Sequence, residues 1–302
     1  MARRPPPNLT DKTLGCFSHV KPSPMLDHLI RFLSTWSGTD KALMFTQYSS
    51  KLIIPLLTLQ HAVRLRLAGT KVYHASNGGS ANARRLEKLY NLIGDARVLF
   101  RIWGILPMIK WMIALERDPP PTRPLHTIER IQGWSMLAYC PMEAVAYLAS
   151  HGILPVSTAN QNRLWLWSCR CWAVYVGLQL LHLVEDNRLL RLRARALERS
   201  RGHPVPAAAV RSSAADDEKK SFSAASKDEL SEEQAVTRKL WDDLDERKQA
   251  ILSELWVNLG YLPLTIHWSC PSGIFNSDVW VGIFGTVAAV SGFRPGWKAT
   301  AA

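Results

Sequence analysis

A short polar stretch, SGTDK at residues 37–41, has the residue types of a phosphate-binding loop. A Walker-type loop needs glycines at both ends of a backbone cradle, then Lys and Ser/Thr at the start of a helix. Gly38 and Lys41 do not have that spacing. Ser37 or Thr39 can instead accept a hydrogen bond from a free backbone N–H, and the aspartate that follows suits the helix dipole. The stretch therefore predicts the start of a helix and no phosphate site.

The cysteines of the sequence predict neither disulfide bonds nor a zinc site. The chain has five scattered cysteines, an odd number that predicts no disulfide framework. The close pair Cys169-x-Cys171 lies in an apolar run and lacks a second Cys/His pair at the spacing of a zinc site. Gly-x-Ser-x-Gly, His-Glu-x-x-His and dinucleotide glycine loops are also missing from the sequence. We expect no metal, no cofactor and no enzymatic activity.

The charge balance favours a polyanionic partner. Lys and Arg number 37 against 25 Asp and Glu, which gives a net charge of +12. Such a surface suits nucleic acid or an anionic membrane. Tryptophan prefers the boundary between lipid headgroups and hydrocarbon. Several tryptophans lie inside or beside long apolar stretches: Trp103, Trp111, Trp165, Trp167, Trp172 and Trp280. We therefore expect an anionic phospholipid membrane, and not nucleic acid, as the partner.

Helical periodicity dominates the chain, and the predicted fold is an all-α integral membrane protein with amphipathic surface helices and about two transmembrane helices. Residues 1–24 are proline-rich and predict a flexible N-terminal tail. Residues 25–163 predict a membrane-associated helical region, with a break or kink at Pro55. Gly78-Gly79 predicts a flexible joint inside this region, and the prolines at 119–121 predict a linker.

Residues 82–102 predict an amphipathic helix that lies on the membrane surface. Its apolar stripe comprises Leu86, Leu89, Tyr90, Ile93 and Phe100, and the basic residues near its start are Arg84, Arg85 and Lys88. These eight residues form the candidate membrane-binding set. Arg97 interrupts the stripe, and its long stem could let the guanidinium reach the headgroups.

The first predicted transmembrane helix is residues 164–184, which is close to the roughly 20 residues that a helix needs to cross a bilayer. Arg170 lies within it, at a cost of about 2.5–3.5 kcal/mol that the surrounding Leu, Trp and Val can offset. Residues 185–235 predict a basic flank followed by a disordered linker. The flank holds the candidate juxtamembrane residues Arg188, Arg191, Arg193 and Arg195.

The C-terminal part predicts a second amphipathic helix at 236–273, a second transmembrane helix at 274–293 and a short tail at 294–302. Small residues at near four-residue spacing let two membrane helices approach closely. Gly282, Gly285 and Ala289 have that pattern in the second span. They are the candidate residues for helix–helix association between copies of the chain.

Four segments together resemble the peroxin-11 family of peroxisomal membrane proteins, in particular its gamma-like branch. They are FLSTWSGTDKALMFTQYSSKL at 32–52, RLEKLYNLIGDARVLFRIW at 85–103, LSELWVNLGYLPLTIHW at 252–268 and VWVGIFGTVAAVSG at 279–292. The resemblance rests on their collinear order, and it extends over most of the chain except the first 24 residues and the linker.

The resemblance implies a factor of the peroxisomal membrane that elongates it before division, by insertion of an amphipathic helix and by self-association. Implied partners are further copies of the chain, related family members, the fission machinery and a peroxisomal import receptor for membrane proteins. An alternative is an oligomeric channel for small metabolites. In that alternative Arg170 and Glu143 would be functional charges inside the membrane.

Overall fold

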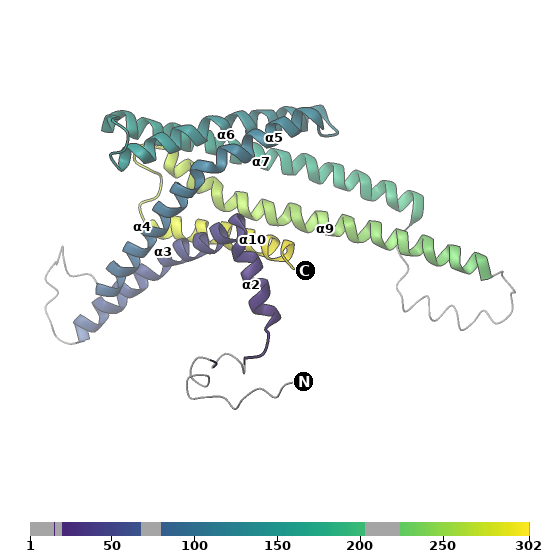
Figure 1. The fold of residues 1–302 in the computed structure, drawn as a ribbon, viewed down its shortest axis with the longest axis horizontal. Helices are drawn as coiled ribbons and strands as arrows, with labels where there is room; N and C mark the ends of the chain where they lie inside the picture. The colour runs from purple at the N-terminus through teal and green to yellow at the C-terminus, as the bar shows by residue number, and fades with distance from the viewer. Residues whose placement is uncertain (1–14, 16–19, 68–79, 203–223, 302) are drawn as a thin grey trace, which may run out of the picture.

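The computed structural model describes residues 15, 20–67, 80–202 and 224–301, and this part of the chain is helical, with no strand (Figure 1). The all-α prediction is therefore confirmed. The helices are α2 (Pro24–Ser34), α3 (Trp36–Leu67), α4 (Ala81–Arg101), η2 (Ile102–Gly104), α5 (Ile105–Arg117), α6 (Arg123–Ser150), α7 (Thr158–Arg201), α9 (Ala224–Ser269) and α10 (Asp278–Ala299).

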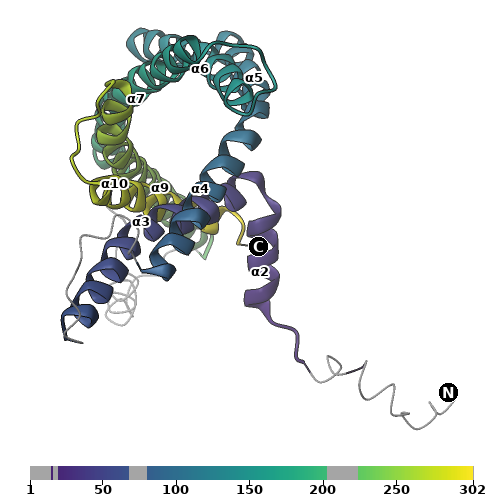
Figure 2. The same ribbon diagram turned by 90° about the vertical axis from the view of Figure 1, so that its left-hand side faces the viewer.

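Six neighbouring helices close into a ring. Helix α6 packs on α7, α7 on α9, α9 on α10, α10 on α3 and α3 on α4. Contacts of α4 and η2 with α6 complete the circle, and α5 also lies on α6. Figure 2 shows this ring end-on. Because each helix buries two flanks against its neighbours, the inner and outer faces of the ring remain for other contacts.

Helices α7 and α9 continue together beyond the ring as a two-helix arm (Figure 1). Leu183, Leu190 and Ile251 form a small buried core between them. Trp241 donates a hydrogen bond from its indole nitrogen to the carbonyl of Gly202 at 3.1 Å. The arm is thus held along its length by apolar contacts, and a polar bond ties α9 to the residue that ends α7.

The structure corrects the expected start of the first long helix. Thr35 interrupts the helical run between α2 and α3, and its hydroxyl accepts a hydrogen bond from the backbone N–H of Gly38 at 3.0 Å. This capping role had been predicted for Ser37 or Thr39. The hydroxyl of Thr39 instead donates to the carbonyl of Leu33 at 2.5 Å. The helix start was found from the sequence, but the capping residue lies just upstream of it.

One bound of the predicted linker is wrong. Helix α9 begins at Ala224, so the linker does not reach residue 235, and the basic flank before it is helical because α7 runs to Arg201. Helix α3 continues through Pro55 to Leu67, so the helix does not break there, and a kink at Pro55 stays a prediction. The remainder of the linker, 203–223, the predicted joint at Gly78-Gly79 and most of the N-terminal tail lie outside the described residues.

The main buried core lies where α3, α9 and α10 meet, and it contains Met44, Tyr48, Leu264, Val281, Ala288 and Ala289. Small residues make this contact possible. A Cβ on Gly285 would lie 2.2 Å from the ring of Tyr48, and a Cβ on Gly260 would lie 2.7 Å from the carbonyl oxygen of Phe284. The glycines of α10 and α9 therefore allow these helices to approach closely within one chain.

Gly285→Ala should destabilise the protein and Gly177→Ala should stabilise it. In helix α7, a Cβ on Gly177 meets no atom within 4 Å, so the change gains about 0.5–1 kcal/mol of helix stability. At Gly285 the same methyl group overlaps Tyr48 and should cost about 1–3 kcal/mol through overpacking. Thermal unfolding of the purified full-length proteins in one detergent measures both shifts. Equal shifts would show that α10 does not pack on Tyr48 as described.

Candidate functional site

The predicted membrane-binding set of α4 is divided between two faces of the helix. Ile93 is only 8% exposed, and the ring of Tyr90 lies 4.5 Å from the ammonium of Lys51 in α3. Leu86 is half-buried, whereas Leu89 and Phe100 are exposed. Part of the predicted stripe therefore packs inside the protein, and only the remainder is available to a membrane.

A longer apolar stripe faces outward over α4, η2 and α5. Its residues recur at helical spacing and are Leu89, Leu92, Leu99, Trp103, Leu106, Ile109 and Ile113. Leu92 is 66% and Trp103 is 71% exposed. We call these seven residues the outer stripe. It continues past residue 102, where the predicted amphipathic helix ends.

Among the described residues, one helical stretch is long and apolar enough to cross a membrane, and it is the stretch that carries the outer stripe. It covers Ala81–Arg117, or 37 residues, and the rest of the chain buries almost none of its apolar window. The segment 164–184, which lies in α7, and the segment 274–293, most of which lies in α10, do not meet the same criterion. Their assignment as transmembrane helices stays a prediction.

The basic residues at the start of α4 are exposed, as a headgroup contact requires. Arg84, Arg85 and Lys88 all lie on the surface, and Arg85 donates to the side-chain carbonyl of Asn82 at 3.4 Å. The outer stripe begins directly after them. One helix thus presents a basic end followed by an apolar side, the arrangement of a helix in an interface.

Helix α2 binds the protein through its polar side. His28 places its Nε2 atom 3.0 Å from the carbonyl of Trp297, and Arg31 donates to the carbonyl of Thr300 at 3.3 Å. Phe32 is fully buried, with its ring centroid 4.8 Å from that of Phe293. These contacts attach α2 to the end of α10.

The apolar side of α2 consequently faces away from the protein. Its exposed residues are Met25, Leu26, Leu29, Ile30 and Leu33. Trp36 follows them, and its ring meets that of Phe100 in α4 edge-on, with 5.2 Å between centroids. This contact joins the first residue of α3 to α4, which carries the outer stripe, and so places the end of α2 near α4. The sequence pattern, which predicts residues 25–163 as one membrane-associated helical region, does not reveal this face.

The other predicted site residues have different surroundings. Arg188, Arg191, Arg193 and Arg195 are exposed on the α7 arm. Of these four, Arg188 lies 3.4 Å from a carboxylate oxygen of Glu185.

The small-residue face of α10 contacts α3 of the same chain. Ala289 is buried, and Cβ atoms on Gly282 and Gly285 would meet Leu52 and Tyr48. This face already has an intramolecular partner, and self-association through it stays a prediction.

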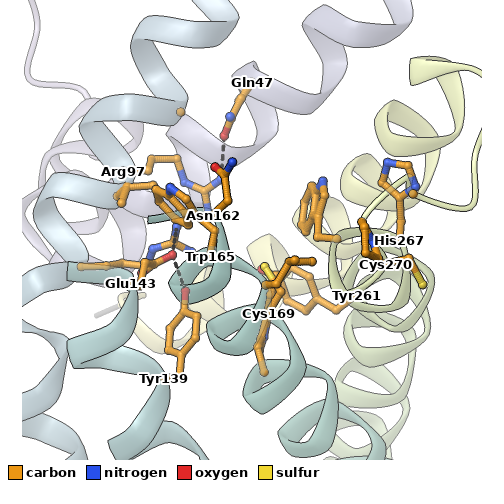
Figure 3. Close-up of a pocket in the computed structure, with 18 of the residues that line it drawn as sticks. Gln47, Arg97, Tyr139, Glu143, Asn162, Trp165, Cys169, Tyr261, His267 and Cys270 are labelled. Atoms are coloured by element: carbon orange, nitrogen blue, oxygen red, sulfur yellow. Dashed lines mark hydrogen bonds and ion pairs between the residues drawn. The ribbon is translucent and has the colours of Figure 1, made fainter. Parts of the chain in front are cut away.

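A cavity of about 890 Å³ lies between the helices of the ring. Residues of α3, α4, α6, α7 and α9 line it, together with the loop between α9 and α10 (Figure 3). Figure 3 shows Arg97, Glu143, Asn162 and Trp165 close together, while His267 and Cys270 lie across the opening from them. The cavity therefore has a polar end and a wall formed largely by aromatic rings.

Arg97 is buried, and this corrects its predicted contact with lipid headgroups. Its Nε lies 2.8 Å from a carboxylate oxygen of Asp40, and its Nη1 donates to the side-chain carbonyl of Gln47 at 2.7 Å. Both partners belong to α3. A buried guanidinium must be paired to avoid a large desolvation cost, so these bonds fix α4 against α3.

A second, partly buried ion pair joins α4 to α6. Nη2 of Arg101 lies 3.0 Å from a carboxylate oxygen of Glu143, and the hydroxyl of Tyr139 donates to the same oxygen at 2.6 Å. Glu143 had been considered as a functional charge in the membrane. The structure places it in the cavity, where its carboxylate accepts from Tyr139 and pairs with Arg101.

Aromatic rings form the rest of the cavity lining. Trp172 stacks on Trp268 with 5.8 Å between centroids and meets Tyr261 edge-on at 5.3 Å. Burial raises the pKa values of Tyr48 and Tyr261 above the ordinary value for tyrosine. Their hydroxyls therefore stay protonated at neutral pH.

Sequence reasoning could not assemble the cavity, because its residues come from five helices. Two signals were visible in the sequence. Arg97 interrupts an apolar stripe, and Glu143 interrupts the apolar run at 134–156. Charges in such places need partners, but the sequence does not identify those partners.

The structure thus defines an all-α protein that exposes apolar helix faces beside basic residues. The sequence profile of peroxisomal biogenesis factor 11 (PEX11) matches residues 56–297, which is most of the chain. The chain belongs to this family, whose members are peroxisomal membrane-associated biogenesis factors. No curated protein and no solved structure matches it. Its placement in the gamma-like branch stays a prediction.

Asp40→Ala should destabilise the protein by about 3 kcal/mol, because it leaves the guanidinium of Arg97 buried without its charge partner. Replacing both residues by Leu should recover at least half of that loss, since no buried charge remains. Arg130→Ala is the control. It breaks an ion pair with Glu116 whose side chains are both 48% exposed, and should cost much less stability than Asp40→Ala. Thermal unfolding measures both losses of stability. An equal loss in Asp40→Ala and Arg130→Ala would contradict the structural role of the buried pair.

Proposed function

We propose that this protein promotes elongation of the peroxisomal membrane during proliferation and division, by placing apolar helix faces in one leaflet. The observation that supports this function is the outer stripe, which the fold leaves uncovered beside the exposed basic start of α4. Family membership supports the organelle and the general role in biogenesis.

The mechanism follows from the area that such helices occupy. An amphipathic helix buried about 5–10 Å deep at the headgroup boundary expands one leaflet relative to the other. The area difference favours a curved bilayer. Arg84, Arg85 and Lys88 would contribute attraction to anionic headgroups of about 1 kcal/mol each.

Helix α2 adds a second apolar face to this surface. Its contacts with α10 are polar and aromatic, so membrane insertion of its outward side would break none of them. The contact of Trp36, at the start of α3, with Phe100 places the end of α2 near α4. We propose that both helices lie against the same leaflet and that their areas add.

Attachment to the membrane would be integral. The predicted spans in α7 and α10 would hold the protein in the bilayer, while the outer stripe of α4 and α5 lies in one leaflet. We further propose that copies of the chain, related family members and the fission machinery assemble on the elongated membrane, with the arginines of the α7 arm on its anionic surface. An import receptor for membrane proteins would deliver the chain.

A second candidate function is an oligomeric channel for small metabolites. The specific observation in its favour is the charged cavity inside the helical ring. Elongation and conduction have different readouts, because a channel releases a trapped solute from a vesicle that keeps its shape.

Leu92→Glu should weaken binding to anionic liposomes about tenfold or more and abolish tubulation, because it places a charge in the outer stripe. A factor of ten corresponds to about 1.4 kcal/mol, which is within the value of one buried leucine. Co-sedimentation and electron microscopy measure binding and tubulation. Asn91→Glu is the matched control, since it adds the same charge at the neighbouring exposed position of α4.

Equal tubulation by Leu92→Glu and Asn91→Glu would show that the outer stripe does not enter the leaflet. Release of a trapped dye by the wild-type protein without any change of vesicle shape would support the channel instead. Circular dichroism of both variants should match the wild type, because each residue is exposed.

Ile30→Glu should reduce tubulation at a fixed protein-to-lipid ratio by about half or more without abolishing it, because α2 supplies only part of the inserted area. Ser34→Glu in the same helix is the control. Its hydroxyl donates to the carbonyl of Ile30 in the same helix, and the residue is exposed. If Ile30→Glu tubulates vesicles as the wild type does, α2 lies away from the membrane.

A further inference from the structure

We propose that the cavity in the helical ring binds a small organic anion. Its carboxylate or phosphate group would bind Arg101, and its flat apolar body would lie against the aromatic wall. This site is separate from the membrane-facing stripe, because it lies inside the ring and the stripe lies outside it.

Arg101 has unused hydrogen-bonding capacity in the cavity. A guanidinium carries five N–H donors in a planar fork that matches a carboxylate or phosphate. Within the described part of the chain, Arg101 has one ion pair, with Glu143 at 3.0 Å. Its Nε is buried and has no hydrogen-bond partner there. This donor needs an acceptor that the protein itself does not supply.

The neighbouring acceptors are already occupied. Asp40 and the carbonyl of Gln47 both accept from Arg97. The carboxylate of Glu143 accepts from Tyr139 and pairs with Arg101. The protein groups at this end of the cavity are therefore not free to satisfy the remaining donors.

Further donors of the lining remain free. Among the described residues, the side chains of Asn162 and Trp165 make no hydrogen bond, and both lie at the polar end in Figure 3. Across the cavity, Nδ1 of His267 accepts from the backbone N–H groups of Ile274 at 2.8 Å and Phe275 at 3.1 Å. Its proton is therefore on Nε2, which is a donor. A lining with excess donors fits a ligand rich in acceptor oxygens.

The volume of the cavity and its lining fit a ligand larger than an inorganic ion. A cavity of about 890 Å³ falls in the range of small-molecule sites, roughly 300–1,000 Å³. The rings of Trp172, Trp268 and Tyr261 offer flat surfaces for stacking. A bare phosphate ion would leave this wall without contact, whereas an anion with a planar body would use both parts of the cavity.

The anion would share Arg101 with Glu143, and this competition provides the test. Removing the charge of Glu143 should release Arg101 and strengthen binding. Removing both charges should eliminate the anion site without leaving either residue as an unpaired charge. A structural role alone would not produce opposite changes in affinity from these two variants.

The experiment uses the full-length protein in nanodiscs of uncharged phosphatidylcholine. The probes are naphthalene-2-carboxylate, 2-naphthyl phosphate and the neutral 2-naphthamide, titrated by saturation-transfer-difference NMR with the signal of protein-free discs subtracted. The two anions distinguish a carboxylate ligand from a phosphate ligand. The amide has the same ring and measures apolar contact alone.

At least one anion should bind tenfold or more tightly than the amide. Glu143→Gln should raise that affinity severalfold, and Arg101→Gln/Glu143→Gln should lower it at least tenfold. Arg117→Gln, at an exposed arginine at the end of α5, should leave it unchanged. Equal affinities for anion and amide, or unchanged anion binding in Glu143→Gln, would overturn the proposal. Glu143→Gln retains the Arg101 guanidinium and the Tyr139 hydroxyl, so its change in affinity tests the proposal even if the double variant loses helicity.

Discussion

The buried pairing of Arg97 with Asp40 and Gln47 is the constraint on which the arrangement of the other helices depends. An arginine in the middle of an apolar helix face has to find a carboxylate or remain in water. By binding α3, Arg97 sets the rotation of α4 about its own axis. That rotation turns Ile93 inward and leaves Leu92 outside. The same ion pair therefore defines both the wall of the cavity and the surface available to lipid.

Helix α4 serves two environments because its two sides differ in chemistry. Its inner side carries Arg97 and Arg101, whose partners lie on α3 and α6. Its outer side is apolar and continues through η2 into α5. Ion pairs fix the inner side in direction and distance, whereas apolar contact with lipid is non-directional. A rigid inner side can thus present an adaptable outer side to membranes of different curvature.

Helices α2 and α10 show that composition alone does not tell which face of a helix meets which partner. In α2 the polar side binds the protein and the apolar side faces out, the reverse of an ordinary surface helix. In α10 the small residues accept the ring of Tyr48, although the same pattern is typical of contacts between membrane helices. Both cases follow from the pairing of α10 with α2 and α3, helices far away in the sequence.

The sequence by itself determined the helical class, the family, the basic start of α4 and the approximate position of most helices. These depend on periodicity, composition and collinear motifs, which are local or additive along the chain. Only the tertiary structure decided that Arg97 is buried, that Glu143 pairs with Arg101 and that α3 covers the small residues of α10. It also decided that the apolar stripe of α4 divides between an inner and an outer face. Apolar periodicity marks a face that avoids water, but protein and lipid both exclude water, so the sequence could not distinguish the two until the helices were placed.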